Sequence, residues 1–319
     1  MTMPTRLAAI LAAGILIGSA LAGNGRAESL FAGPTAPAVA ESAVPAVQWS
    51  GPAMAGLALA EVAADRSLGE RAMDTVHMLA DEIGSRPAGS ANERRAADYL
   101  AGEYRALDYA VNVIPFPFNV SSGRGDSQNV EARSPNEDPN ARLVIIGGHY
   151  DTVPAGPGAN DNGSGTATIL EVARELAAHP VSGVAVRYIA FGAEEPGLLG
   201  SKAYVNSMSE SERRRTVLMM SIDMMAVGDQ PAFGGTPEWV FEALARAESQ
   251  GFRPINQSDR LRRMSDHASF IDAGMPAMMF HWVDDPFYHT ALDVSANVRP
   301  DAMDLMGAIA IELVRVAAS

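Results

Sequence analysis

The chain has 319 residues, of which 47% are hydrophobic, and it contains no cysteine. Its length suits one large α/β domain or two small ones with a full apolar core. The absence of cysteine excludes disulfide bonds, thiolate catalysis and lipid anchoring through cysteine, so an exported form depends on burial and bound metal for its stability. A net charge of −14 repels phosphate, and we therefore expect no nucleic-acid partner.

The first 27 residues have the pattern of an export signal. Arg6 supplies the positive start, residues 7–22 are apolar, and small residues offer a cleavage site after Ala22 or Ala27. Because a membrane span needs about 20 apolar residues, we expect cleavage and export to the periplasm or the exterior without stable membrane insertion. The alternative is a chain tethered to the membrane by an uncleaved N-terminal segment.

Residues 28–65 are rich in Ala, Pro, Gly and Val and carry little charge. Proline at this density interrupts regular structure, so this stretch is predicted to be a tether, with one short helix possible at 54–64. The folded domain is predicted to occupy residues 66–319.

The first part of this domain combines helices and strands. Apolar residues recur at helical spacing in two stretches of 68–107, separated by a turn at 84–87. Ser90 or Asn92 is a suitable N-cap for the second helix. Alternating patterns at 109–120 and 127–132 then predict a β-hairpin.

Three apolar runs, at 143–146, 184–191 and 217–222, have the length and composition of buried strands. A helical pattern at 166–179 separates the first two, and strand–helix–strand order implies a parallel crossover. Polar residues follow each run directly: His149 the first, Glu194 and Glu195 the second, and Asp223 the third. In open α/β sheets ligands bind outside the carboxyl ends of the strands, so these side chains are expected to converge.

Five residues in chain order are the candidate metal ligands: His149, Asp161, Glu195, Asp223 and His289. Zinc accepts histidine nitrogen and carboxylate oxygen, and a catalytic site keeps one position open for water. Two imidazoles and three carboxylates therefore suffice for two zinc ions if one carboxylate bridges them.

Asp151 and Asp161 each have an alternative interpretation. Asp151 lies two residues after His149 on the same side of a strand, where it can orient the imidazole, but it is also typical of a simple turn aspartate. Asp161, in the glycine-rich loop 157–165, resembles a helix cap in a phosphate-binding loop; however, the phosphate-loop lysine and the G-x-G-x-x-G spacing are both missing.

Glu194 and Glu195 are adjacent carboxylates, which repel each other unless a metal neutralises one and the other takes a proton. This division predicts one ligand and one general base; the alternative is a solvated acidic pair that caps a helix. Asp223 at a buried strand end requires a partner, either a metal or an arginine.

The remaining candidates lie late in the chain. Tyr288, beside His289, is a candidate hydrogen-bond donor to an oxyanion or an ordinary packed tyrosine. Asp266 is expected near the metals, holding Glu194 or a substrate amine. His267 and His281 are interpreted as structural.

Together these motifs resemble the co-catalytic di-zinc aminopeptidases of metallopeptidase family twenty-eight, which includes exported bacterial leucyl-type aminopeptidases and the domain of glutamate carboxypeptidase. The resemblance covers residues 73–319 and is carried by the blocks 148–151, 158–165, 194–201, 265–270 and 288–290. It implies an α/β fold: a single-domain three-layer sandwich whose mixed, mostly parallel central sheet is flanked by helices, the zinc-dependent exopeptidase fold.

The resemblance also implies roles for the residues. Asp161 would bridge two Zn²⁺ ions, and Glu194 would be the general base, with Asp151 supporting the ligands. One zinc ion would be completed by His149 and Asp223, and the other by Glu195 and His289. No position departs from the family pattern.

The implied function is hydrolysis of peptides with a free N-terminus. The alternatives are a glutaminyl-cyclase-like acyltransferase, against which the intact five-ligand set argues, and a carboxypeptidase on the same scaffold. A binding domain with a structural metal is a third possibility, but a closed structural site needs no base beside it, and Glu194 is present.

Overall fold

The computed structural model describes residues 66–120 and 123–319. The predicted export signal, the tether and the short helix at 54–64 lie outside these residues. Within the described part, no helix combines the length and the apolar character needed to span a bilayer.

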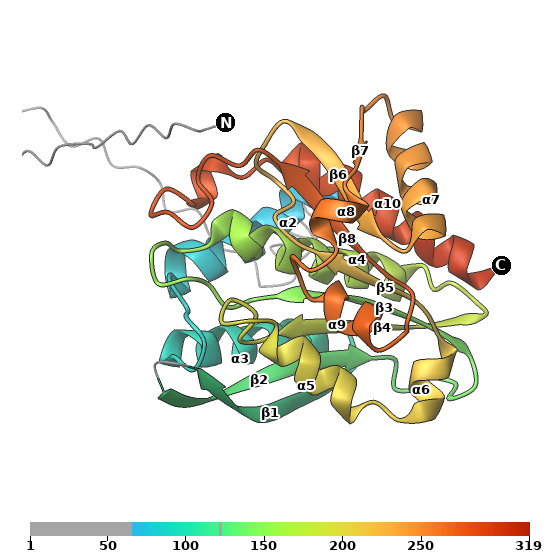
Figure 1. Cartoon of the computed structure of the whole chain (residues 1–319), viewed down its shortest axis with the longest axis horizontal. Coiled ribbons are helices and arrows are strands. Elements are labelled where there is room, and N and C mark those ends of the chain that lie inside the picture. The colour runs from blue at the N-terminus through green and yellow to red at the C-terminus, as the bar shows by residue number, and fades with distance from the viewer. Residues whose placement is uncertain (1–65, 121–122) are drawn as a thin grey trace, which may run out of the picture. The chain divides into compact units, whose positions relative to one another are not determined.

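Eight strands form one mixed sheet in the order β1-β2-β4-β3-β5-β8-β6-β7 (Figure 1). The four central strands, β4, β3, β5 and β8, run parallel, whereas β1, β2 and β6 pair in antiparallel fashion. The prediction of a mixed and mostly parallel sheet is therefore confirmed. The strands are β1 (Ala110–Val120), β2 (Gly123–Arg133), β3 (Arg142–His149), β4 (Val184–Phe191), β5 (Thr216–Ile222), β6 (Gln230–Gly235), β7 (Ile255–Asn256) and β8 (Ala277–Val283).

Helices cover both faces of the sheet and complete the three layers. One face carries α2 (Leu68–His77), α3 (Ala91–Ala106), α4 (Gly165–Ala178), α7 (Pro237–Ser249) and α10 (Pro300–Ala318). The other face carries α5 (Leu199–Ser207), α8 (Ser258–Leu261) and α9 (His267–Asp272), while α6 (Glu210–Arg215) leads into β5. Three short helical turns complete the chain: η1 (Met78–Ile83), η2 (Ala159–Ser164) and η3 (Ser295–Asn297).

The alternation of side chains on β3 explains why this strand is apolar throughout. Val144 and Ile146 belong to the larger core beneath α4 and α10, whereas Leu143 and Ile145 belong to the smaller core beneath α5 and α9. Because successive side chains point to opposite faces, a strand buried on both sides cannot alternate with polar residues. After the exposed Arg142 at its start, the next polar side chain of the strand is His149, its last residue.

The helices and the hairpin predicted for residues 68–132 are present in the structure. The two helical stretches form α2 and α3, and the hydroxyl of Ser90 caps α3 by accepting from the Glu93 amide at 3.0 Å. Asn92 is not the cap; its amide donates to the carbonyls of Ile83 and Ser85. The predicted hairpin is β1 and β2, although β2 begins at Gly123, before the predicted start at 127.

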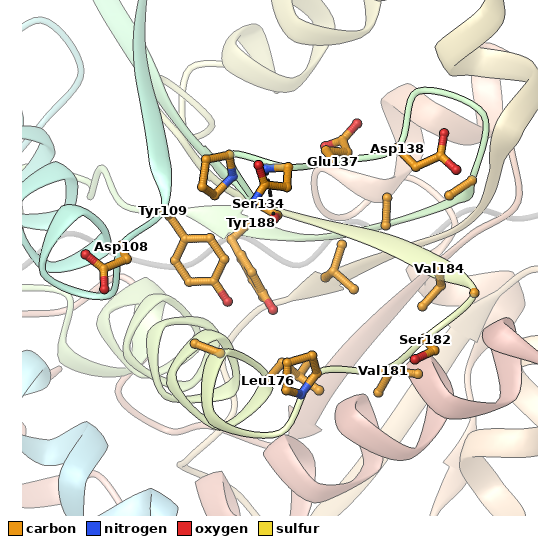
Figure 2. Close-up of a pocket in the computed structure, with 18 of the residues that line it drawn as sticks. Asp108, Tyr109, Ser134, Glu137, Asp138, Leu176, Val181, Ser182, Val184 and Tyr188 are labelled. Atoms are coloured by element: carbon orange, nitrogen blue, oxygen red, sulfur yellow. Dashed lines mark hydrogen bonds between the residues drawn. The ribbon is translucent and has the colours of Figure 1, made fainter.

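A cavity of about 650 Å³ lies near the amino ends of β3 and β4 (Figure 2). Tyr109, Leu176, Val184 and Tyr188 contribute to its lining, and the hydroxyl of Tyr109 donates to a main-chain carbonyl of α4. None of the residues that line it is a candidate catalytic residue. The candidate site lies instead at the carboxyl ends of the strands.

Candidate metal centre

The five candidate ligands line one pocket of about 480 Å³. His149 ends β3, Glu195 follows β4, and Asp223 follows β5. Asp161 lies in η2, which precedes α4, and His289 lies in the loop after β8. In the sheet, β3 lies between β4 and β5. The chain passes from β3 to β4, its neighbour in one direction, and later to β5, its neighbour in the other direction. The pocket therefore forms where the strand order reverses.

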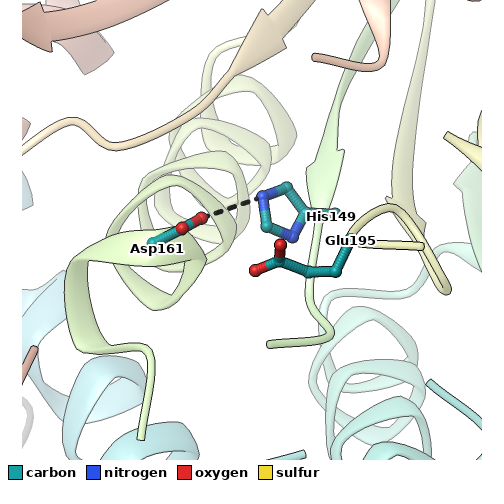
Figure 3. Close-up of side chains that lie close together, drawn as sticks. All are labelled: His149, Asp161 and Glu195. Atoms are coloured by element: carbon teal, nitrogen blue, oxygen red, sulfur yellow. Dashed lines mark ion pairs between the residues drawn. The ribbon is translucent and has the colours of Figure 1, made fainter. Parts of the chain in front are cut away.

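The carboxylate of Asp161 lies between the two histidines. Its Oδ1 is 3.2 Å from Nε2 of His149, and its Oδ2 is 3.1 Å from Nε2 of His289. His149 Nε2 is also 3.4 Å from Oδ1 of Asp223, and His289 Nε2 is 3.2 Å from Oε2 of Glu195. Figure 3 shows His149, Asp161 and Glu195 converging from three separate segments. The five side chains thus form two groups that share Asp161.

These separations fit ligands of a common metal ion. Bonds of about 2.0 to 2.2 Å in tetrahedral geometry place neighbouring ligand atoms about 3.3 to 3.6 Å apart, close to the observed 3.1 to 3.4 Å. One ligand atom each from His149, Asp161 and Glu195 lies within 4.8 Å of the others. The donor set, two imidazoles and three carboxylates, suits zinc.

The electrostatics of the site also favour a bound cation. Burial and the nearby charge of Asp161 raise the pKa of Glu195 to about 7. The buried Oδ1 of Asp223 has no hydrogen-bond partner among the described residues. Carboxylates buried at this density are costly unless they are protonated or paired with positive charge, and a metal ion supplies that charge.

Asp151 supports the site in a different way from the one predicted. Nδ1 of His149 donates to the main-chain carbonyl of Asp151 at 3.1 Å, whereas the carboxylate of Asp151 is 3.7 Å away. That carboxylate instead accepts hydrogen bonds from the amides of Glu194 and Glu195 at 2.9 and 3.3 Å. The residue therefore fixes the imidazole through its main chain and the Glu194–Glu195 loop through its side chain.

The loop of Asp161 is held by Asp293, a residue to which the sequence analysis assigned no role. The carboxylate of Asp293 accepts from the amide of Asn160 at 2.6 Å and from that of Asp161 at 3.0 Å. The peptide bond between Asp161 and Asn162 is cis. Asp293 lies only four residues after His289, and this proximity is the signal that could have identified it.

The two asparagines that flank Asp161 connect its loop to the segment that carries Asp223. The side chain of Asn162 donates to the carbonyl of Ile222 at 2.9 Å and accepts from the amide of Met224 at 3.2 Å. Oδ1 of Asn160 accepts from the amide of Ala226 at 2.9 Å. These bonds fix the separation between Asp161 and Asp223.

A close approach at the start of α4 requires glycine. A side chain at Gly165 would place its Cβ 2.2 Å from the carbonyl oxygen of Ile222 and 2.3 Å from Oδ1 of Asn162. The helix can therefore lie against the end of β5 only without a side chain at this position.

Two buried charged residues from the N-terminal part of the described chain, Arg86 and Glu93, hydrogen-bond to the loops of the site. The guanidinium of Arg86 donates to the carbonyls of Tyr150, Pro157 and Gly158, at 2.5, 2.6 and 2.9 Å. Glu93 accepts from the amide of Ala193 at 3.2 Å, and burial raises its pKa to about 7. The sequence analysis missed both, because a single charged residue in a turn or a helix carries no local sign of its distant partner.

Several residues around the centre have left-handed backbone conformations. Ala193 (φ 51°), Leu198 (φ 59°), Met224 (φ 54°) and His289 (φ 57°) all adopt positive φ. Such conformations cost about 1 to 3 kcal/mol each, and they persist only where the surrounding structure enforces them. Here they lie at or beside Glu194, Glu195, Asp223 and His289.

Of the other predicted residues, Glu194 and Tyr288 line the pocket, whereas Asp266 is not part of its lining. Burial raises the pKa of the Glu194 carboxyl group. Tyr288 lines the pocket and is 46% exposed, with its ring stacked on that of His289 at 3.8 Å between centroids. Asp266 is fully buried, its carboxylate has no hydrogen-bond partner among the described residues, and burial raises its pKa to about 7.

The two histidines interpreted as structural differ in position. His267 is buried outside the pocket lining, and burial lowers its pKa to about 4. His281 lines the pocket, and its Nδ1 donates to the main-chain carbonyl of Asp223 at 3.4 Å. His281 therefore has a place in the site that the sequence analysis did not predict.

Comparison with known proteins identifies the family. Residues 129–314, more than half of the chain, match Peptidase family M28. The chain belongs to this family. The matched segment contains all five candidate ligands, and the resemblance inferred from the motifs is confirmed.

Relatives in the family differ in length from this chain. The chain is 37% identical over 208 residues to the aminopeptidase YwaD of Bacillus subtilis. The aligned region covers 59% of this chain and 45% of YwaD. The chain spans about half the length of the curated relatives it matches.

Solved structures confirm the fold. BSAP, a zinc aminopeptidase from Bacillus subtilis, has a TM-score of 0.69 at 22% identity, covering 78% of this chain and 96% of BSAP. A glutaminyl cyclase from Tannerella forsythia has a TM-score of 0.67 at 19% identity, covering 77% of this chain and 98% of the cyclase. The fold alone therefore does not distinguish the two reactions.

Proposed function

We propose that the protein is a zinc-dependent exopeptidase, an aminopeptidase that hydrolyses N-terminal residues from peptides. The observation that carries the proposal is the position of Asp161, whose two carboxylate oxygens face His149 on one side and His289 on the other. A single carboxylate between two such groups is the arrangement that a pair of metal ions requires. Membership of the peptidase family and the names of the relatives support the reaction class.

Two zinc ions are proposed to bind in this pocket. His149 and Asp223 would hold one, Glu195 and His289 would hold the other, and Asp161 would bridge them. The pairwise separations of 3.1 to 3.4 Å between ligand atoms support this division. Asp151 would keep the ligand loops in place, and Asp266 would stand behind Glu194.

Zinc held by these ligands would lower the pKa of a water molecule to about 7 and would polarise the scissile carbonyl. Glu194, a buried carboxylate of the pocket that is not required as a ligand and is adjacent to the ligand Glu195, accepts the proton as the water attacks. The same carboxyl group then delivers that proton to the leaving amine. Tyr288, half exposed at the pocket, donates a hydrogen bond to the oxyanion.

The substrates are proposed to be peptides with a free N-terminus. The glutaminyl-cyclase reaction remains the rival, because cyclases share the fold. The complete five-residue ligand set and Glu194 together favour hydrolysis over cyclisation and over a purely structural metal. Export is also proposed, with cleavage of the signal at residues 1–27 and a tether at 28–65.

The decisive experiment compares a free-amine substrate with its blocked form. The purified protein should cleave leucine p-nitroanilide but not the N-acetylated compound, and chelation should abolish activity until zinc is restored. Metal analysis should find about two zinc ions per chain. A protein that binds zinc and cyclises glutamine-led peptides without hydrolysing free-amine substrates would overturn the proposal in favour of the cyclase.

The role of Glu194 is tested by Glu194→Gln, with Glu210→Gln as the matched control on exposed α6. Loss of a general base should lower kcat by about 10²-fold to 10⁴-fold while zinc content stays normal. Full hydrolysis by Glu194→Gln at normal zinc content would refute its role as the base.

A further inference from the structure

The lining of the pocket carries both signs of charge. Its acidic residues are Asp161, Glu194, Glu195, Asp223, Asp284 and Asp285. Its arginines are Arg260 and Arg263, contributed by α8 and the turn that follows it. A substrate that enters this pocket therefore meets guanidinium groups as well as the acidic metal centre.

Arg260 has no ion-pair partner among the described residues. Its neighbour Arg263 pairs with Asp272 at 3.5 Å, and both side chains of that pair are more than half exposed. Arg262, between them, is exposed and does not line the pocket. In a chain with 38 acidic and 24 basic residues, an arginine that lines an acidic pocket and still lacks a carboxylate is available for a ligand.

Arg260 lines the same pocket as the candidate ligands. Asp223 and His281 contribute to this lining together with Arg260, so the guanidinium borders the space in which a substrate would lie.

We propose that Arg260 binds a carboxylate group of the substrate while the free amine of the substrate faces the acidic metal centre. The inference rests on the proposed aminopeptidase function and narrows its substrates to peptides that carry a carboxylate near the cleaved bond. A pocket of about 480 Å³ is of the size that holds a short peptide. Guanidinium and carboxylate are complementary in geometry as well as charge, because two N–H groups can bind both oxygens.

The carboxylate can come from two sources: the C-terminus of a dipeptide or tripeptide, or an acidic side chain at the cleaved residue. Two pairs of substrates distinguish these sources, because the two members of a pair differ in little more than charge. Leucylglycine against leucylglycinamide tests the C-terminal carboxylate. Glutamylglycinamide against glutaminylglycinamide tests the side chain.

The measurement is the ratio of kcat/KM within each pair, for the full-length protein loaded with zinc and for three variants. In the unmodified protein the anionic member of at least one pair should be favoured about 10-fold, as expected for one charge-assisted hydrogen bond. Arg260→Gln should bring that ratio close to one, and Arg260→Glu should invert it. Arg262→Gln, the adjacent exposed arginine outside the pocket, should leave the ratio as it was.

Folding is not expected to confound the result, because Arg260 is exposed; unfolding temperature and zinc content of each variant verify this. If Arg260→Gln keeps the preference, or the unmodified protein shows none in either pair, the inference is overturned while hydrolysis of all four substrates leaves the proposed function standing. If none of the four is hydrolysed by the unmodified protein, the proposed function and this inference fall together.

Discussion

Replacing Arg86 should destabilise the protein more than replacing any exposed arginine, because this side chain joins three segments beneath the metal centre. Arg86 is fully buried and lies in the turn between η1 and α3. Its guanidinium donates to the carbonyl of Leu79 at 3.2 Å as well as to those of Tyr150, Pro157 and Gly158. The last three carbonyls belong to the loop that connects His149 to Asp161.

The magnitude follows from these contacts. A hydrogen bond to a charged group contributes about 1.5 to 3 kcal/mol, but four bonds from one side chain are not additive, and burial of the cation has its own cost. That cost is visible in the pKa of Arg86, which burial lowers to about 10. Removing one member of a buried charged network typically costs about 3 to 5 kcal/mol, so Arg86→Met should lower the unfolding temperature by about 10 °C in a domain of this size.

Thermal unfolding followed by circular dichroism tests this estimate. Arg86→Lys keeps the charge but reaches fewer carbonyls. Its unfolding temperature should therefore lie between those of Arg86→Met and the unmodified protein. Arg105→Met, at an exposed position of α3, is the matched control and should change the free energy of unfolding by less than about 0.5 kcal/mol. An Arg86→Met protein that unfolds within about 2 °C of the unmodified one would refute the argument that these bonds hold the loop.

Two further predictions concern the buried acidic residues Asp293 and Glu93. Asp293→Ala removes the acceptor of the Asn160 and Asp161 amides and should weaken zinc binding by about 10-fold to 100-fold, measured by competition with a chelator; unchanged affinity would contradict the assigned role. Glu93 has a folded-state pKa of about 7 against an ordinary 4.5, so between these pH values the folded chain keeps a proton that the unfolded chain has lost. The free energy of unfolding should therefore fall by about 3 kcal/mol as pH rises through this window, and urea unfolding of Glu93→Gln should show a correspondingly flatter profile. Parallel profiles for the two proteins would rule out this contribution.

The sequence was most informative where local pattern and chemistry coincide. The runs that became β3, β4 and β5 are apolar because both faces of the sheet are covered, and the first polar residues after them had to lie at one edge. The predicted ligands consequently meet in one pocket. The five residues come together although 140 positions (289 − 149) separate the outermost two.

The sequence was least informative about short elements and distant partners. Helices α8 and α9 have four and six residues, too few for helical periodicity to be recognised, and β8 was not predicted although its residues 277–283 are mostly apolar. Arg86 and Asp293 have their roles only through contacts with segments 64 and 133 positions away. A single sequence does not show which distant segments such residues contact, although the position of Asp293 four residues after His289 is a local sign that it lies near the site.

The arrangement of charge explains how so many acids can occupy one place. The positive charge of Arg86 interacts favourably with the negative charges of four residues: Asp293, Asp151, Asp161 and Glu195. One buried cation therefore already offsets part of the repulsion between these carboxylates. It cannot offset all of it, since burial still raises the pKa of Glu195 to about 7 and that of Asp293 to about 6. A bound metal would neutralise the remainder, and a ligand that binds only the folded state at 1,000 times its Kd stabilises it by about 4 kcal/mol. This is of the size that one disulfide contributes, so in a chain without cysteine the metal centre that performs the chemistry would also supply the stabilisation that a cross-link gives other proteins.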